Sequence, residues 1–184
     1  MRTGRRNSGS QKVALCGMFG ALALTLMLSG GILPAATFAA PAFAGILIVP
    51  AAIEFGMPTG YVLYAAIGLL SFFLVPDKEM SLIFLFFLGF YPLLKANLER
   101  IRRRLLRVAA KFALFNGCIF LMYTLLLTVF PLPSVTADFE SAGSAMLAVL
   151  VVFANITFAL YDVAIARIIG LYCAKIRPRL LRFH

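Results

Sequence analysis

Residues 98–111 read LERIRRRLLRVAAK, a basic stretch that separates two long apolar runs. Apolar runs of this length predict helices that cross a bilayer, and the Lys and Arg residues of a membrane protein gather in its cytoplasmic loops. The stretch therefore predicts a cytoplasmic loop, and its charges help to orient the helices on either side of it.

The composition of the whole chain indicates a membrane environment. Of its 184 residues, 62% are hydrophobic and 13% are charged, and the mean hydropathy is +0.99. A soluble domain of this length cannot bury so much apolar surface. We therefore expect an all-α membrane protein.

Six apolar segments are long enough for the hydrocarbon core, which needs about 20 residues per helix. The predicted spans are 12–30, 36–55, 59–75, 80–97, 109–130 and 144–172. They form a single six-helix transmembrane domain over 12–173, between basic tails at 1–11 and 174–184. The start of the chain also resembles a secretory signal, but its apolar region continues past the small-residue motif at 42–44, so we expect the first helix to be retained.

The basic residues predict the orientation of this bundle. Sixteen of the 17 Lys and Arg residues lie in the N-terminal tail, in the loop between the fourth and fifth spans, and at the C-terminal end. An even number of spans places all three segments on one side. Both termini are expected in the cytoplasm of a multi-pass protein of the cell membrane, and Lys78 is the only cation on the outer side.

The basic loop 98–111 has two interpretations. Its arginines match an RNA or phosphate-binding patch, but no aromatic residue is interleaved among them for base stacking. They also match an anchor on anionic lipid, with about 1 kcal/mol per basic residue close to the surface. We expect lipid and no nucleic acid, and an amphipathic helix that can also bind a partner.

No set of residues for catalysis, metal or cofactor binding is visible in the sequence. Cys16, Cys118 and Cys173 are far apart, and His184 is the only histidine. Zinc and haem sites need closer clusters of these residue types. Because there is also no Walker loop, we expect no enzyme activity, no metal and no cofactor, and any ATP must be used by another subunit.

A few polar residues interrupt the predicted spans. Asn155 lies about 16 Å below the outer end of its span, close to the membrane midplane. Such groups either line a cavity or make hydrogen bonds between helices. As a group they predict a substrate cavity that opens outward. Its predicted lining is Tyr91, Tyr123, Thr124, Thr128, Asn155 and Thr157.

The outer turn Phe73 to Ser81 reads FLVPDKEMS and has three charged residues. Asp77 is placed to cap the next helix, and Glu79 falls in the first turn, where the helix dipole favours an acid. Lys78 has no such explanation. We expect Lys78 and Glu79 at the rim of the cavity, with a pairing of Lys78 to Asp138 or Glu140 as the alternative.

One acidic residue, Asp162, lies deep in the last span. A carboxylate inside a membrane needs a partner, and Arg167 is poorly placed because it is about 140° round the helix. We therefore expect a structural ion pair between Asp162 and Lys95, Lys111 or an arginine of the basic loop.

Small residues recur along one side of the first span. Gly17 and Ala21 are four residues apart, Ala14 joins their face, and Cys16 and Gly20 form a second small pair. Small residues at this spacing let another helix approach closely. The helix is either a docking face for a separate membrane subunit or part of ordinary packing inside this protein.

The chain has six predicted spans in fewer than 200 residues, small residues on the first span, the Gly30-Gly31-x-x-Pro34 break after it and a basic C-terminal end. In these features it resembles the S-components of energy-coupling factor (ECF) transporters. The resemblance implies a substrate-binding subunit that captures a vitamin or similar micronutrient from outside. It also implies docking through the first span onto a membrane coupling subunit driven by two cytoplasmic ATPases. The family pattern Ala-x-x-x-Ala is represented here by Gly17-x-x-x-Ala21.

A second hypothesis belongs to another class of protein. The chain would be a non-transporting membrane scaffold or assembly protein that holds a partner through its basic loop. It predicts a tightly packed bundle without an outer cavity, whereas the transport hypothesis predicts a cavity near Asn155.

Overall fold

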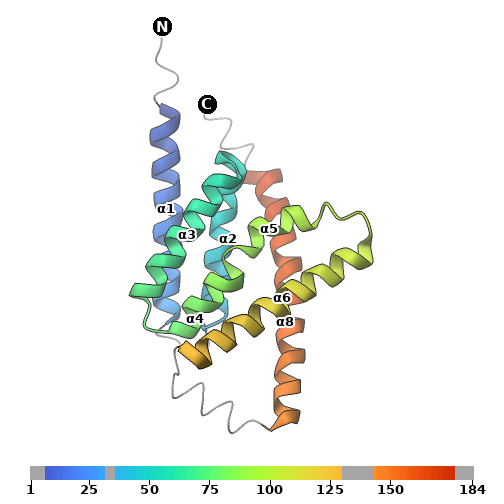
Figure 1. The fold of residues 1–184 in the computed structure, drawn as a ribbon. Coiled ribbons are helices and arrows are strands. Elements are labelled where there is room, and N and C mark those ends of the chain that lie inside the picture. The colour runs from blue at the N-terminus through green and yellow to red at the C-terminus, as the bar shows by residue number, and fades with distance from the viewer. Residues whose placement is uncertain (1–6, 32–35, 130–142, 177–184) are drawn as a thin grey trace. The chain divides into compact units, whose positions relative to one another are not determined.

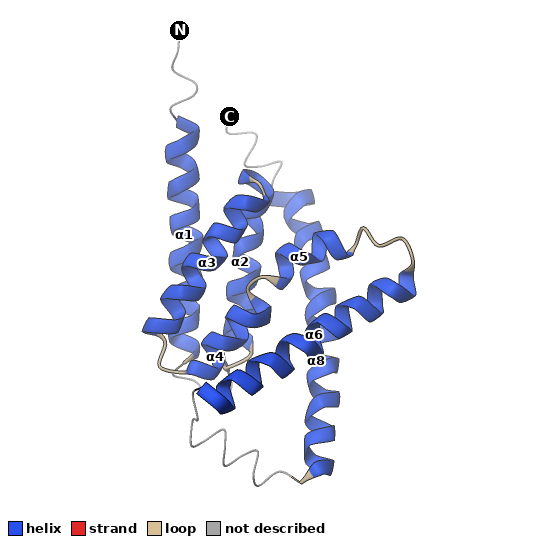
Figure 2. Ribbon diagram, viewed as in Figure 1, coloured by secondary structure: helices blue, strands red, loops and turns tan. Residues whose placement is uncertain are grey.

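The computed structural model describes residues 7–31, 36–129 and 143–176, and every regular element among them is a helix (Figures 1 and 2). By length and composition, five of the described helices can cross a membrane: residues 9–30, 57–74, 78–98, 104–129 and 146–175. A sixth apolar helix, 39–55, has 17 residues. The described part of the chain is thus all-helical, with several long apolar helices compatible with a membrane bundle.

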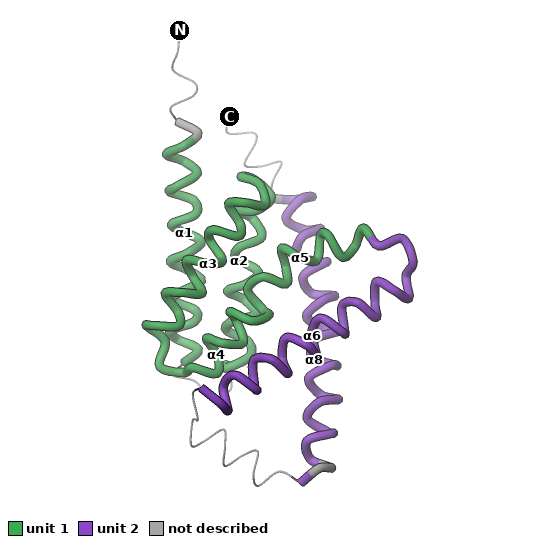
Figure 3. Tube along the Cα trace, viewed as in Figure 1, with its two compact units in different colours: residues 1–100 green, residues 101–184 purple. Residues whose placement is uncertain are grey.

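The chain divides into two compact units, residues 1–100 and residues 101–184 (Figure 3). The helices of the first unit are α1 (Asn7–Gly30), α2 (Ala39–Phe55), α3 (Met57–Leu74), α4 (Lys78–Ile83), η2 (Phe84–Leu88) and α5 (Tyr91–Leu98). Those of the second unit are α6 (Arg104–Val129), α8 (Ser144–Leu171) and η3 (Tyr172–Ile176).

Four apolar passes of alternating direction make up the first unit. At one end, a Cβ added to Gly30 of α1 would lie 2.3 Å from the Ala40 Cβ of α2 and 3.1 Å from the Met80 Sδ of α4. At the other end, a Cβ added to Gly60 of α3 would lie 2.7 Å from the Ala52 Cβ and 2.9 Å from a Leu93 methyl group. The glycines let the backbones approach closely where the passes meet.

The fourth pass is not one continuous α-helix. Five residues, Phe84–Leu88, form a π-helical turn in which the Gly89 amide donates to the Phe84 carbonyl at 2.8 Å. The Leu85 carbonyl is then available to the Tyr64 hydroxyl, which donates to it. Pro92 lies in the first turn of α5, which begins at Tyr91, and there its missing N–H does least harm. The predicted uniform span 80–97 is thus divided into α4, η2 and α5.

In the second unit, α6 begins at Arg104 and continues to Val129. The predicted loop 98–111 therefore supplies the first two turns of α6, and the break in helix is confined to residues 99–103. Lys111, Phe115 and Asn116 of α6 contact Asp162, Phe158 and Asn155 of α8, respectively. Because one set of numbers rises as the other falls, the two helices are antiparallel where they meet.

Candidate functional site

A polar contact joins two otherwise apolar helices of the second unit. We call it the α6–α8 seam, and it consists of Lys111, Phe112, Phe115, Asn116, Asn155, Phe158 and Asp162. The α6 members are two adjacent pairs, Lys111–Phe112 and Phe115–Asn116, that lie four residues apart, and the α8 members are three and four residues apart, which places each set on one face of its helix. The seam therefore follows from the helical register of the two segments.

An ion pair forms one end of the seam. The Lys111 ammonium donates to both carboxylate oxygens of Asp162, at 3.0 and 2.9 Å, and the two side chains are 10% and 22% exposed. Lys111 was one of the candidate partners for Asp162 in the sequence. A charged side chain inside an apolar membrane segment is usually stabilised by a close opposite charge.

A pair of side-chain amides forms the other end. The Asn116 Nδ2 donates to the Asn155 Oδ1 at 2.8 Å, and the Asn155 Nδ2 donates back to the Asn116 Oδ1 at 3.1 Å. Each Nδ2 also donates to a carbonyl of its own helix, at Phe112 and Val151. The second bond uses the remaining N–H of each amide and fixes its orientation, so within the pair each side chain faces the other with one donor beside one acceptor.

Aromatic rings separate the two polar ends of the seam. Phe115 stacks on Phe158 with ring centroids 4.7 Å apart and planes 5° from parallel, and Phe112 meets the same ring edge-on at 5.2 Å. Offset stacking and edge contacts are both favourable aromatic geometries. The Asn116 side chain remains exposed, so the amide pair lies at the accessible side of a packed aromatic contact.

The threonines that the sequence predicts in the cavity are bonded within their own helices. The hydroxyls of Thr124, Thr128 and Thr157 each donate to a carbonyl four residues earlier on their own helix. Thr157 also points away, because two residues turn a helix by about 200°. Tyr123 is half-buried and lies seven residues after Asn116, on the same side of α6.

The remaining predicted substrate contacts lie in the first unit. Tyr91 is 0% exposed and stacks on Phe87 at 4.8 Å, so its ring fills the core. The Lys78 ammonium donates to the carbonyls of Phe72 and Val75, at 2.8 and 3.1 Å, and thereby caps the end of α3. Asp138 and Glu140, its alternative partners, lie outside the described residues.

The turn that carries Lys78 is well bonded. Asp77 accepts from the Met80 amide at 3.1 Å as the N-cap of α4, and the Thr37 hydroxyl donates to the same carboxylate at 3.4 Å. Glu79 falls in the first turn of α4, where an acid is favoured. These contacts give Asp77 and Lys78 structural roles in joining α3 to α4.

One buried charge in the first unit pairs with a residue four positions later in the chain. Lys95 is only 2% exposed and forms an ion pair with Glu99 at 3.5 Å. The (i, i+4) spacing of these residues was the available signal. From the sequence, Lys95 was counted among the cytoplasmic charges and was one of the candidate partners of Asp162.

The small residues of α1 line an open groove beside α3. Gly17, Gly20 and Ala21 contribute to its wall, together with Cys16, whereas Ala14 is exposed outside the groove. A Cβ added to Gly17 would meet nothing within 4 Å. The predicted docking face is therefore open at Gly17 in this chain.

Within the described residues, no group of three or more His, Cys, Asp or Glu side chains could hold a metal ion. Comparison of the chain with protein-family models, with curated proteins and with solved structures finds no match. Its function has therefore to be argued from the seam and the groove.

Proposed function

We propose that this chain is the substrate-capture membrane subunit of an importer of the ECF type. It would cross the cell membrane six times with both termini in the cytoplasm and bind a vitamin-like molecule from the outer side. The observation that carries the proposal is the amide pair of Asn116 and Asn155. Polar side chains inside apolar helices are costly, and they mark substrate pathways more often than other positions.

The amide pair suits recognition of a small polar molecule. Its two hydrogen bonds are reciprocal, so a ligand edge with one donor next to one acceptor can replace either asparagine as a partner of the other. The bonds to the Phe112 and Val151 carbonyls hold both amides in place when that exchange occurs. Cyclic amides and ring nitrogens of water-soluble vitamins have such edges.

The groove on α1 supports the second half of the proposal. An importer subunit without its own ATP site must bind a coupling subunit, and its ATPases must lie on the cytoplasmic side. The exposed small residues Ala14, Gly17 and Ala21 allow a neighbouring helix to approach α1 closely. Anionic lipid would bind the basic residues between α5 and α6.

The scaffold hypothesis is favoured by a different feature of the seam. Each polar side chain of the seam already has a partner on the neighbouring helix, as expected of a purely structural contact that holds α6 to α8. Such a structural contact is complete without a bound ligand. The two hypotheses differ in whether Asn155 changes its partner when a small molecule is added.

A thermal-shift panel of water-soluble vitamins separates the two hypotheses. We expect one compound to raise the melting temperature of the wild-type protein, because a ligand that binds only the folded state stabilises it. Asn155→Ala and Asn116→Ala should abolish that ligand-induced shift, whatever their own melting temperatures.

The matched control is Thr157→Val, which changes a side chain that points away from the amide pair and is bonded to its own helix. This variant should respond to the same compound as the wild type. A panel without any shift, or a shift that survives both asparagine variants, would favour the scaffold.

A further inference from the structure

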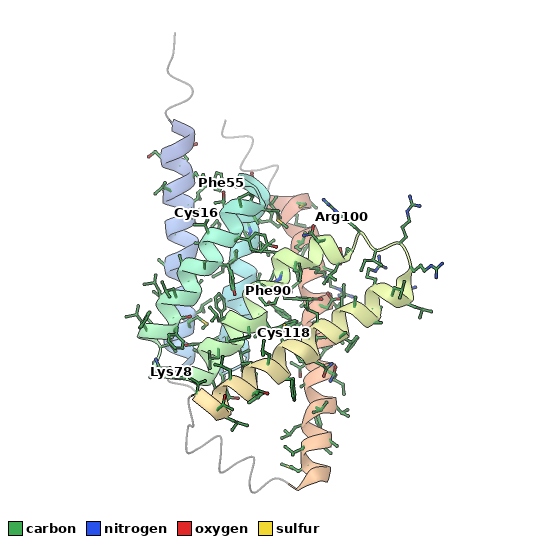
Figure 4. All side chains as sticks on the ribbon, viewed as in Figure 1. Cys16, Phe55, Lys78, Phe90, Arg100 and Cys118 are labelled. Carbon is green, nitrogen blue, oxygen red and sulfur yellow. The ribbon has the colours of Figure 1, made fainter. Side chains whose placement is uncertain are left out.

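The groove between α1 and α3 has dimensions and chemistry that point to an occupant of its own. It encloses about 520 Å³, and its wall is made by side chains of α1 and α3 alone. In Figure 4, Cys16 of this wall lies toward the Phe55 end of the first unit, opposite Lys78. The lining is apolar except at Lys12 and Thr59, which are the first lining residues of α1 and α3.

The groove is about as long as one leaflet of a bilayer. On α1 the lining runs from Lys12 to Leu24, which is about 18 Å at 1.5 Å per residue. On α3 it runs from Thr59 to Leu70, about 17 Å. Half of a hydrocarbon core that is about 30 Å thick has a similar length.

Close packing closes the groove beyond Leu24. Met27 is completely buried, and Gly30 approaches Ala40 and Met80 so closely that no side chain fits there. Toward Lys12 the two helices leave space, because a Cβ added to Gly17 would meet nothing within 4 Å. A Cβ added to Gly20 would lie 3.2 Å from the Leu63 Cδ1, so the Leu63 side chain forms the bottom of the groove. On α1 the groove is thus open from Lys12 to Leu24 and ends there.

A charge stands at the open end of the groove. Lys12 is exposed, and it is the only charged residue in the lining. Lys12 lies about 18 Å along α1 from Leu24, which is the distance at which the hydrocarbon of one leaflet would give way to headgroups. Thr59 donates its hydroxyl proton to the Phe55 carbonyl, so the cation is the feature that distinguishes one headgroup from another.

We propose that this groove binds one acyl chain of an anionic phospholipid, with the headgroup phosphate held by Lys12. The acyl chain of the lipid would lie along Gly17 and Gly20 and end near Leu24. A membrane-spanning helix of another protein would be covered by the groove over only about half of its length. The lipid therefore fills the groove in the isolated chain, and a coupling subunit that docks on α1 would displace it. Lipid binding at this groove does not depend on the proposed function, because it concerns the protein by itself in a bilayer.

Native mass spectrometry of the purified protein tests this site, with phosphatidylglycerol or phosphatidylcholine added. The wild type should retain one phosphatidylglycerol more strongly than one phosphatidylcholine. Gly17→Leu fills the groove without a clash and should lose most of the bound lipid of either kind. Lys12→Gln should lower the preference for phosphatidylglycerol about fivefold while it still retains phosphatidylcholine.

The matched control is Gly117→Leu, because Gly117 lies on α6 and a Cβ there also meets nothing within 4 Å. It should retain lipid as the wild type does. The proposal is overturned if the wild type retains no phosphatidylglycerol, if Gly17→Leu retains as much as the wild type, or if Lys12→Gln keeps the full preference. A wild-type dimer that Gly17→Leu converts to monomer would assign the groove to a second copy of the chain.

Discussion

Replacing Lys111 with Met is expected to lower the free energy of unfolding by about 3 kcal/mol. The reason is the ion pair of the seam, in which the Lys111 ammonium lies 2.9 and 3.0 Å from the two oxygens of Asp162. Removing the cation leaves a carboxylate inside an apolar helix without its close opposite charge. We expect the lower end of the usual range, because Asp162 is partly exposed.

The measurement is reversible unfolding in detergent, followed by circular dichroism. The double variant Lys111→Met with Asp162→Leu should recover much of the loss, because it removes the second charge as well. Arg104→Met is the control, since Arg104 is an exposed cation at the start of the same helix. A Lys111→Met variant as stable as Arg104→Met would show that the pair does not hold α6 to α8.

Replacing Gly60 with Val is expected to destabilise the first unit by about 1–3 kcal/mol. Gly60 is the point at which α3 approaches both α2 and α5. A Cβ there would lie 2.7 Å from the Ala52 Cβ and 2.9 Å from a Leu93 methyl group, closer than side-chain carbons approach one another. The helices must therefore separate, and the neighbouring side chains lose contact.

The same unfolding measurement applies, with Gly117→Val as the matched control. Gly117 also lies inside an apolar helix, but its surroundings are open within 4 Å. The control accounts for the change in helix propensity, so the difference between the two variants reports the packing at Gly60. Equal stability of the two variants would contradict the close approach of α2, α3 and α5.

The class of fold was accessible from the sequence because it depends on the length of apolar runs. Most helix ends fall within a few residues of the predicted spans, and Gly56, at φ 90°, ends α2 where only a residue without a side chain is unstrained. The break in the fourth pass was not predicted. Its signals were Gly89 and Pro92, but the Tyr64 hydroxyl that donates to the Leu85 carbonyl of the π-helical turn comes from another helix.

The candidate site was predicted less completely. Asn155 was identified as an unusual residue in an apolar span, but its partner Asn116 was overlooked, although it is equally unusual in the fifth span. The five hydroxyl residues predicted to line the cavity were grouped with Asn155 by their depth in the membrane. Depth alone does not say on which face of its helix a side chain lies. Helical phase alone separates Thr157 from Asn155, because about 200° lies between them.

Contacts between helices could not be derived from the pattern of one segment. The pairing of Lys111 with Asp162 requires the register of α6 against α8, and the sequence left Lys95 and several arginines as equal candidates. The ammonium of Lys78 bonds two carbonyls at the end of α3, a role that depends on the geometry of the turn. The partners of Lys78 and Lys111 are therefore set by the folded backbone, which brings the α3 carbonyls and Asp162 close to them.

The proposed function is tested most directly by identifying small molecules that remain bound through purification. Wild-type protein and Asn155→Ala would be purified in parallel and denatured, and the released compounds identified by mass spectrometry. The proposal predicts one vitamin-like compound in the wild-type extract, near one per chain, and its loss from the variant. An extract without such a compound, or the same compound in equal amount from both proteins, would contradict a substrate site at the amide pair.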